Sequence, residues 1–591
     1  MQHVHDDEIT GKAYDSKLMK RLLAFLRPYG KQVLMAIILM LGYTFVDLSL
    51  PYLTKIAIDD YIIKDNFTKI YEIILPFLGL LVLQFVVQYV QTYLMGWIGQ
   101  RVIFDIRMKV FQHLQRLSLK YFSQNPVGRL VTRVTTDIET LNELFSSGIV
   151  AIFGDIFLLI GIVVVMLRIN WRLALVTFSV LPFLVFVTTL FRIKVRENFR
   201  QVRLRIARIN SYLQENISGM LIVQLFNREK LNFKKFDELN HSHLEAHIKT
   251  ILYFAIYFPT VELIFTVATA LIIWYGGAQF ISGTMTFGIL TAFLQYARRF
   301  FRPISDLSEK YNIMQLAMAS SERVFKLLDQ QPLIINSPKN ISPDYIRPHI
   351  EFKNVWFRYN DDDPYVLQDV SFDVNRGEKI AIVGYTGAGK TTIINLLCRF
   401  YDVTDGEICI DGVNIKDYDL HQLRRHFGLV LQDVFIFSGD IKGNIRLGEK
   451  SISDEQVIQA ATNVHIHQFI EKLPNQYGEQ VTERGSTLSM GQKQLLSFAR
   501  ALAFNPDILI LDEATSSIDT ETEFLIQDAL KRLMMNRTSI IIAHRLSTIK
   551  FCDKIIVIHK GEIREVGTHT QLLRKKGIYY KLYQLQHKIH V

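Results

Sequence analysis

The sequence has few cysteines, and they are not spaced for a shared function. Only three occur among 591 residues: Cys398, Cys409 and Cys552. They form neither a Cys-x-x-Cys pair nor a metal-ligand cluster. A reduced, cytosolic setting is the simplest interpretation of the region that holds them.

Long hydrophobic runs are also absent from the second half of the chain. Hydrophobic residues make up 49% of the sequence and charged residues 21%, but every run long enough to cross a bilayer lies before about residue 300. The remainder is typical of a soluble α/β domain, and the length predicts several domains. The polar, acidic start Met1–Glu8 has no cleavable apolar signal, so we expect the first spanning helix to target the chain to a membrane.

Six apolar segments have the length that a spanning helix needs. The connections at 101–143 and 192–250 are long and carry seven and twelve Lys/Arg, whereas the three short ones carry five together. Positive charge marks cytoplasmic segments, so both long connections and the soluble half are predicted in the cytosol. The net charge of +10 is therefore attributed to basic surfaces that face lipid headgroups, and no nucleic-acid partner is expected. The predicted spans are Val33–Leu53, Ile73–Ile98, Leu144–Leu167, Leu173–Phe191, Ile251–Gly276 and Phe280–Ala297.

Apolar residues recur at helical spacing in the first long connection, for example Val102, Ile106 and Val110. This pattern predicts that the spanning helices continue well beyond the bilayer.

Three carboxylates and two amides lie inside the predicted spans: Asp47, Asp155 and Glu262, with Gln84 and Gln88. An ionised carboxylate facing lipid is costly, so such groups face the bundle interior or a water-filled cavity. One interpretation is a polar cavity for cationic amphiphiles or a proton-coupled site. The alternative is helix–helix hydrogen bonding or a position nearer the interface, and the sequence does not choose between them.

A phosphate-binding loop follows the buried-strand run Lys379–Val383 and precedes a helical stretch. Its pattern GxxxxGK[ST], with a strand before and a helix after, predicts a nucleotide site. Backbone N–H groups and the helix N-terminus would cradle the phosphates, Lys390 would contact the β- and γ-phosphates, and Thr391 would supply its hydroxyl to Mg²⁺. The predicted ATP-binding residues of the loop are Gly384, Tyr385, Thr386, Gly387, Ala388, Gly389, Lys390, Thr391 and Thr392.

Two further strand ends complete the predicted hydrolytic set. The apolar run Ile508–Leu511 ends in Asp512 and Glu513, and the run Ser539–Ala543 ends in His544. We expect Asp512 to hold the Mg²⁺ shell and Glu513 to polarise the attacking water.

The segment Leu488–Gln492 followed by Lys493–Arg500 resembles the signature segment of ABC ATPases, which other P-loop proteins lack. That resemblance implies that Tyr359 stacks on adenine, that Gln432 senses Mg²⁺ and takes part in catalysis, and that His544 is the switch histidine. It also implies that Ser489, Gly491 and Gln492 meet the nucleotide of a partner chain. Thr482–Gly485, Ser516–Asp519 and Tyr121–Arg133 resemble the exporter-specific segment, the dimer-contact loop and the first coupling segment.

The resemblance predicts a membrane all-α domain of six transmembrane helices fused to a cytoplasmic α/β P-loop ABC ATPase domain. We expect an amino-terminal segment at 1–32, a transmembrane domain at 33–302, a helical linker at 303–349 and the nucleotide-binding domain at 350–591.

A chain of this kind is half of a dimer, so a second half-transporter is implied. The signature usually has glycine where this chain has Met490, and glycine permits positive φ or close approach to phosphate. The resemblance is therefore to the competent subunit of a bacterial heterodimeric exporter. A non-identical partner is favoured, with a homodimer as the alternative.

The expected function is ATP-driven export of drugs or other amphiphiles across the cytoplasmic (inner) membrane of a bacterium. A homodimeric lipid flippase is the alternative. An ATP-gated regulator or channel is a third reading, but it needs lost hydrolytic residues or an added regulatory domain, and the sequence shows neither.

The Glu513→Gln change tests the predicted base. Hydrolysis should fall by about 100-fold or more, because general-base catalysis supplies that much, while ATP still binds. ATPase turnover and nucleotide binding would be measured on the same preparation. Retained turnover would remove Glu513 from this role.

Overall fold

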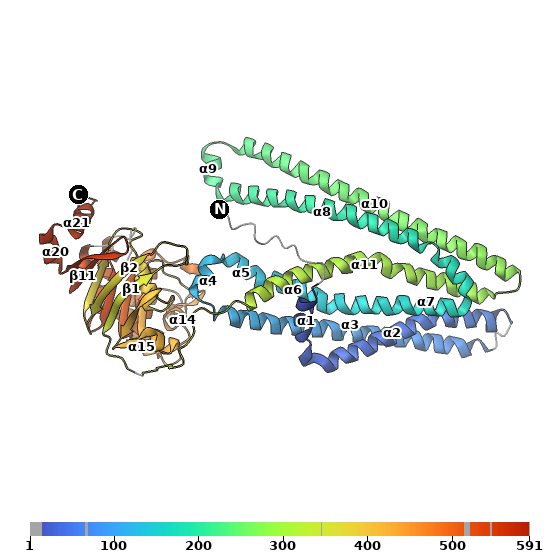
Figure 1. The fold of residues 1–591 in the computed structure, drawn as a ribbon, viewed down its shortest axis with the longest axis horizontal. Helices are drawn as coiled ribbons and strands as arrows, with labels where there is room; N and C mark the ends of the chain where they lie inside the picture. Colours follow the sequence, from blue (N-terminus) through green and yellow to red (C-terminus); the bar gives the residue numbers. More distant parts are fainter. Residues whose placement is uncertain (1–14, 65–68, 344, 513–519, 544–545, 590–591) are drawn as a thin grey trace. The chain divides into compact units, whose positions relative to one another are not determined.

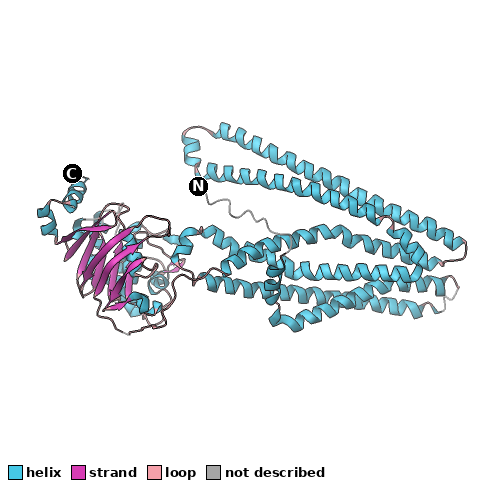
Figure 2. Ribbon diagram, viewed as in Figure 1, coloured by secondary structure: helices cyan, strands magenta, loops and turns pink. Residues whose placement is uncertain are grey.

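The computed structural model describes residues 15–64, 69–343, 345–512, 520–543 and 546–589. Contacts between residues divide the chain into two units. Unit 1 comprises residues 1–115 and 127–330, and unit 2 comprises residues 116–126 and 331–591. The described part of unit 1 is helical, whereas the described strands all belong to unit 2 (Figures 1 and 2).

Six long helices form most of unit 1. In the first long connection Val102, Ile106 and Val110 are buried within α3, which confirms the predicted helical continuation there. The helices α8 and α10 lie side by side and are joined at one end by α9 (Figure 1). The long helices are α2 (Gly30–Ile56), α3 (Tyr71–Leu114), α7 (Ile149–Phe178), α8 (Leu181–Ser218), α10 (Glu229–Ile281) and α11 (Phe287–Leu328).

Short helical segments connect these six. Asp15 caps the first of them, α1, by accepting hydrogen bonds from the backbone N–H groups of Lys17 and Leu18. The short segments of unit 1 are α1 (Ser16–Ala24), η1 (Arg27–Tyr29), η2 (Ala57–Ile62), α5 (Val127–Val134), α6 (Thr136–Glu143), η4 (Leu144–Gly148) and α9 (Met220–Leu225).

Among the described residues, four helical stretches are long and apolar enough to cross a membrane by length and composition. They are Arg27–Ile62, Tyr71–Leu114, Ile152–Phe178 and Glu229–Ile281. The helices α8 and α11 are as long as the others, at 38 and 42 residues, but they are not among the four. Their apolar stretches are interrupted by charge, such as Arg192 and Lys194 in α8 and the Arg298–Arg299 pair in α11.

Two predicted span boundaries are wrong. The segment Leu173–Phe191 begins inside α7, which ends at Phe178, and Phe280–Ala297 begins inside α10, which ends at Ile281. The chain turns at Ser179–Val180 in the first case and around Gly283, with φ of +73°, in the second. Hydropathy misses both turns because apolar residues flank them on both sides. The predicted break near Arg168–Arg172 does coincide with a non-helical Asn170 inside α7.

Four ion pairs run along α11 and join it to four different helices. Arg299 contacts a carboxylate of α2 at 2.7 Å, and Asp329, which follows α11, accepts a bidentate pair from Arg21 of α1 at 2.6 and 2.7 Å. The hydrogen bond from Arg21 lowers the pKa of Asp329. The helix that leads out of unit 1 is therefore held at several levels. The pairs are Arg299–Asp47 (α2), Lys310–Asp155 (α7), Arg323–Asp137 (α6) and Asp329–Arg21 (α1).

A largely parallel sheet organises unit 2. Its strand order is β12-β11-β3-β10-β9-β6, with only β12 antiparallel to its neighbour. A four-stranded antiparallel sheet has the order β2-β1-β4-β5, and β7 pairs with β8. The strands are β1 (Ile350–Phe357), β2 (Leu367–Val374), β3 (Lys379–Val383), β4 (Asp405–Ile410), β5 (Val413–Asn414), β6 (Phe427–Val430), β7 (Gly439–Asp440), β8 (Gln480–Val481), β9 (Ile508–Asp512), β10 (Thr538–Ile542), β11 (Lys554–His559) and β12 (Glu562–Gly567).

The central strands are buried on both faces, which explains their continuous apolar sequence. In β9, Ile508 and Ile510 join the core shared with α12, whereas Leu509 and Leu511 join the core shared with α17 and α18. The helices of unit 2 are α4 (Leu119–Gln124), α12 (Lys390–Leu397), η5 (Ile415–Asp417), α13 (Leu420–Arg425), α14 (Ile441–Arg446), α15 (Asp454–Asn463), α16 (His467–Glu471), η6 (Gln476–Gly478), η7 (Glu483–Gly485), α17 (Met490–Ala503), α18 (Thr520–Leu533), α19 (Leu546–Ile549), α20 (His569–Lys575) and α21 (Ile578–Ile589).

The predicted coupling segment Tyr121–Arg133 is divided between the units. Residues 116–126, which include α4, group with unit 2, and α5 groups with unit 1. Within unit 2 the Gln124 side-chain amide donates to the Asn360 side-chain oxygen at 3.3 Å.

The Arg323→Met change tests the α11 ion pairs. Asp137 is 8% exposed, so removing its arginine leaves a buried carboxylate with a weaker set of partners. We expect the free energy of unfolding to fall by about 3 kcal/mol, which would be seen as a lower melting temperature in detergent. The control Arg200→Met removes an exposed pair with Glu197 and should have little effect. If Asp137→Asn in the Arg323→Met background restored no stability, the pairing argument would fail.

Candidate functional site

The parallel order of the central sheet gathers the predicted nucleotide residues at one edge. The strands β3, β10, β9 and β6 are neighbours and run in the same direction, so their carboxyl ends meet there. The phosphate loop follows β3, Asp512 is the last residue of β9, and Gln432 lies two residues after β6. Three segments distant in sequence thus reach the same edge.

The loop 384–389 has a backbone that its glycines permit. Gly387 and Gly389 have φ of +79° and +102°, which residues with a Cβ rarely adopt. At Gly384 a Cβ would lie 2.2 Å from the Ile558 carbonyl oxygen of β11. The loop therefore rests against the neighbouring strand before it turns into α12, the helix that begins at Lys390.

Lys390 is folded back onto its own loop. Its Nζ donates to the carbonyl oxygens of Gly384 and Tyr385 at 2.8 and 3.1 Å. The residue is 7% exposed. Burial lowers the pKa of the Lys390 ammonium, and the Asp512 carboxylate opposes that shift by raising it. Because the ammonium is shielded from water, its attraction to an anion that enters the loop is stronger.

The two threonines after the lysine have different surroundings. Thr391 is exposed, whereas Thr392 is buried and its hydroxyl is 3.1 Å from the Tyr359 hydroxyl. The Tyr359 ring packs edge-on against Phe357 and Tyr401, with centroid distances of 4.9 and 5.2 Å. Tyr359 is thereby fixed beside the loop and half-buried, and Thr391 is left open at the start of α12.

The other loop residues differ in exposure. Tyr385 and Thr386 are exposed and Ala388 is buried. The Tyr385 ring lies 5.8 Å from the ring of His559, the last residue of β11. Sequence reasoning did not single out His559, because nothing in its own strand pattern places it beside the loop.

The remaining hydrolytic residues are only partly described. Asp512 is 9% exposed at the end of β9, and Gln432 is exposed beyond β6. Glu513, the segment Ser516–Asp519 and His544 lie outside the described residues.

The signature segment begins α17 with a reciprocal cap. The Ser489 hydroxyl accepts from the Gln492 backbone N–H at 3.2 Å, and the Ser489 N–H donates to the Gln492 side chain at 2.9 Å. This arrangement satisfies two backbone N–H groups at the start of the helix. Gly491 is buried in the first turn.

Of the two reasons given for a glycine at position 490, positive φ and close approach to phosphate, the first does not apply. Met490 is the first residue of α17 and has a negative, helical φ, so any residue can adopt this backbone. Its side chain is 54% exposed. Met490 therefore strains nothing within the chain, and it differs from glycine here by the bulk of an exposed side chain.

Two of the three carboxylates in the predicted spans are paired. Asp47 accepts from Arg299 at 2.7 Å and from Gln84 at 3.2 Å. Asp155 accepts from Lys310. For these two, helix–helix pairing is the interpretation that the structure supports.

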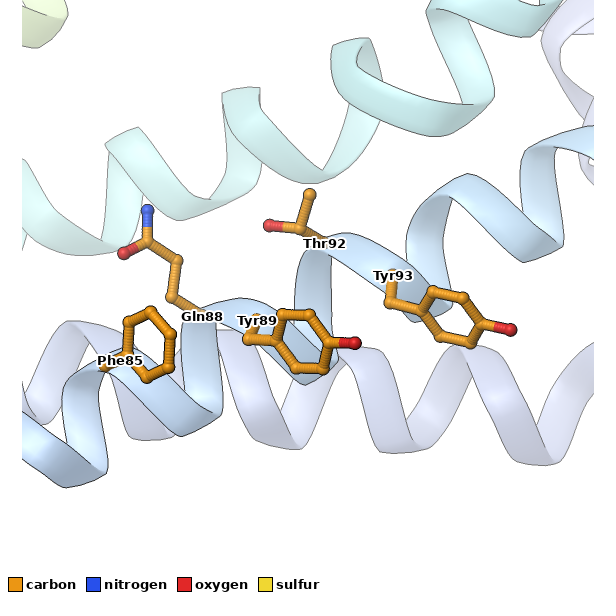
Figure 3. Close-up of a pocket in the computed structure, with 5 residues that line it drawn as sticks. All are labelled: Phe85, Gln88, Tyr89, Thr92 and Tyr93. Carbon is orange, nitrogen blue, oxygen red and sulfur yellow. The ribbon is translucent and has the colours of Figure 1, made fainter.

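Gln88 instead lines an open hollow on α3. The side chains of Tyr89 and Tyr93 project from one side of the helix, next to Phe85, and Thr92 completes the lining (Figure 3). The five lining residues carry no formal charge.

The Gly384→Ala change tests the close approach of the loop to β11. The added Cβ must push the loop away from the Ile558 carbonyl, so ATP affinity should fall about tenfold or more. Gly478→Ala is the matched control, because a Cβ at Gly478 meets nothing within 4 Å. Equal ATP affinity in titrations of both variants would contradict the assigned geometry.

Comparisons with known proteins agree with this architecture. The family description "ABC transporter transmembrane region" matches residues 33–304, and "ABC transporter" matches residues 367–516. An uncharacterized ABC transporter ATP-binding protein of Bacillus subtilis, YknV, is 42% identical over 98% of this chain and 96% of its own length. An ATP-dependent lipid A-core flippase of Syntrophus aciditrophicus is 38% identical over 97% and 95%.

A third relative, from Bacillus subtilis, is provisionally named a multidrug export ATP-binding/permease protein. It is 36% identical over 96% of this chain and 99% of its own length. The solved structure of a bacterial Atm1-family ABC exporter with ATP bound superimposes with a TM-score of 0.78 at 28% identity, covering 95% of this chain and 99% of that one. The chain belongs to the ABC transporter family and is an exporter with a transmembrane region and an ATP-hydrolysing domain in one polypeptide.

Proposed function

We propose that this chain exports drugs or other amphiphilic small molecules across the cytoplasmic membrane of a bacterium. The observation that carries the proposal is the nucleotide edge of unit 2, where the Asp512 carboxylate acts electrostatically on the Lys390 ammonium, in a polypeptide that also holds a transmembrane region. A relative named for multidrug export matches nearly the whole length. ATP-driven alternating access joins the two functions, since a transport cavity must open to one side at a time.

The nucleotide site has a defined task for each residue. Lys390 leaves its two loop carbonyls to bind the β- and γ-phosphates, and the backbone N–H groups of residues 384–392 surround them. Thr391, Gln432 and Asp512 are the oxygen donors that would hold Mg²⁺, which offsets phosphate charge when it is bound with ATP. Tyr359 supplies the aromatic face for adenine.

Hydrolysis needs two residues that follow β9 and β10. We propose that Glu513 orients and deprotonates the attacking water and that His544 contacts the γ-phosphate. In the central sheet β10 is the neighbour of β3, the strand that precedes the phosphate loop, and β9 is the next strand after β10.

ABC exporters work as dimers, and we propose that the partner here is a non-identical chain. Ser489, Gly491 and Gln492 would face the partner's nucleotide, and the exposed Met490 side chain would add bulk at that contact. The dimer would have two nucleotide sites. The site that this chain's signature segment completes would hydrolyse ATP more weakly, whereas the site that contains this chain's Lys390 and Asp512 would be the active one. Unit 2 would then lie in the cytosol, and lipid would surround unit 1.

Lipid flipping by a homodimer is the second candidate. It is favoured by the 38% identity, over nearly the whole length, to a protein named as a lipid A-core flippase.

Expression of the chain alone separates these proposals. The molar mass of the purified protein would be measured by light scattering. The protein would then be reconstituted in vesicles, and its ATPase activity would be assayed in the presence of a panel of drugs and lipids. We expect weak, poorly stimulated turnover that rises when a second half-transporter from the native membrane is co-purified. A stable homodimer with full drug-stimulated ATPase would refute the non-identical partner, and stimulation by lipid alone would refute drug export. Lys390→Ala provides the inactive background.

A further inference from the structure

Glu262 differs from the other two carboxylates of the predicted spans. It lies near the middle of Ile251–Gly276, within α10, and its side chain is exposed. No hydrogen bond or ion pair to its carboxylate is found among the described residues, whereas Asp47 and Asp155 both meet a base. The Thr266 hydroxyl bonds only the backbone carbonyl of Glu262. An ionised carboxylate within a spanning helix normally faces the bundle interior or a water-filled cavity, where a ligand can reach it.

An aromatic cluster lies one helical turn away. Phe258 precedes Glu262 by four residues, so both project from the same face of α10. Phe258 is 60% exposed, and its ring lies 5.7 Å from Phe254 and 5.6 Å from Tyr257. Tyr257 in turn stacks on Phe191 of α8 at 3.9 Å, which fixes the cluster against the neighbouring helix.

A carboxylate one helical turn from a largely exposed phenyl ring is suited to a particular ligand chemistry. The carboxylate attracts positive charge, and the ring face adds a cation–π contact that strengthens when water is excluded. A metal ion would need several oxygen donors, and no cluster of three or more His, Cys, Asp or Glu occurs among the described residues. The combination therefore fits an organic cation with an apolar body.

We propose that Glu262 and Phe258 bind the charged end of amphipathic organic cations. This inference rests on the proposed export of amphiphiles and names the class of substrate. It replaces the broader expectation that all three carboxylates attract cations, because Asp47 and Asp155 are neutralised by Arg299 and Lys310.

The test compares a cation with an uncharged molecule of similar shape. Binding of radiolabelled tetraphenylphosphonium and of triphenylphosphine oxide would be measured by equilibrium dialysis on the purified full-length protein. Glu262→Gln should weaken binding of the cation about tenfold and leave the neutral molecule unaffected, the loss expected for one charge-assisted contact. Glu262→Asp should retain most of the affinity. Glu238→Gln, a change on an exposed part of the same helix, is the matched control.

Two results would overturn the inference. One is unchanged binding of the cation by Glu262→Gln. The other is an equal loss for both molecules together with a lower dimer fraction or melting temperature, which would assign Glu262 to a contact with the partner subunit. Transport into vesicles is measured separately. Glu262-dependent binding without transport of either molecule would therefore contradict the proposed export, while the binding site would stand.

Discussion

The ion pairs along α11 are the interactions on which the helical unit depends. A charge withdrawn from water is stable only beside its opposite, and α11 places a base or an acid against each of four other helices. Arg299 lies beside an apolar run, where an unpaired guanidinium would be costly. The same helix is the last of the membrane region before the chain enters the ATPase unit, so the segment that leaves unit 1 is tied to its neighbours by charge.

The ATPase unit depends on a different constraint, the order of parallel strands. Because β3, β10, β9 and β6 are adjacent, the phosphate loop, Asp512 and Gln432 meet although more than a hundred residues separate the first and second of them. The buried strands hold this edge rigidly from both faces. The Lys390 ammonium is bonded to two carbonyls of its own loop. An incoming anion would therefore meet an ammonium whose positive charge is only partly compensated by those two carbonyls.

Charge also separates the structural from the functional groups in the membrane region. Asp47 and Asp155 are satisfied within the chain and serve the packing of helices, whereas Glu262 faces outward beside Phe258. The signature segment of unit 2 shows the same distinction. Ser489 and Gln492 stabilise the start of α17, whereas the exposed Met490 side chain takes no part in that cap. What such outward groups meet depends on a second chain or a substrate.

The sequence by itself determined the type of the long membrane helices and of the strands around the phosphate loop, because apolar runs, the phosphate-loop pattern and the buried strand runs are local signals. It placed the phosphate loop with Lys390 and the strand end with Asp512, and it gave Gln432 only through the resemblance to ABC ATPases. It missed the turns at Ser179–Val180 and Gly283, where hydropathy does not change. Only the tertiary structure decided which carboxylates are neutralised. Asp47 and Arg299 are separated by 252 residues, and no local pattern links them. Pairing between distant charges is a property of packed helices, so it becomes visible only when those helices are placed side by side.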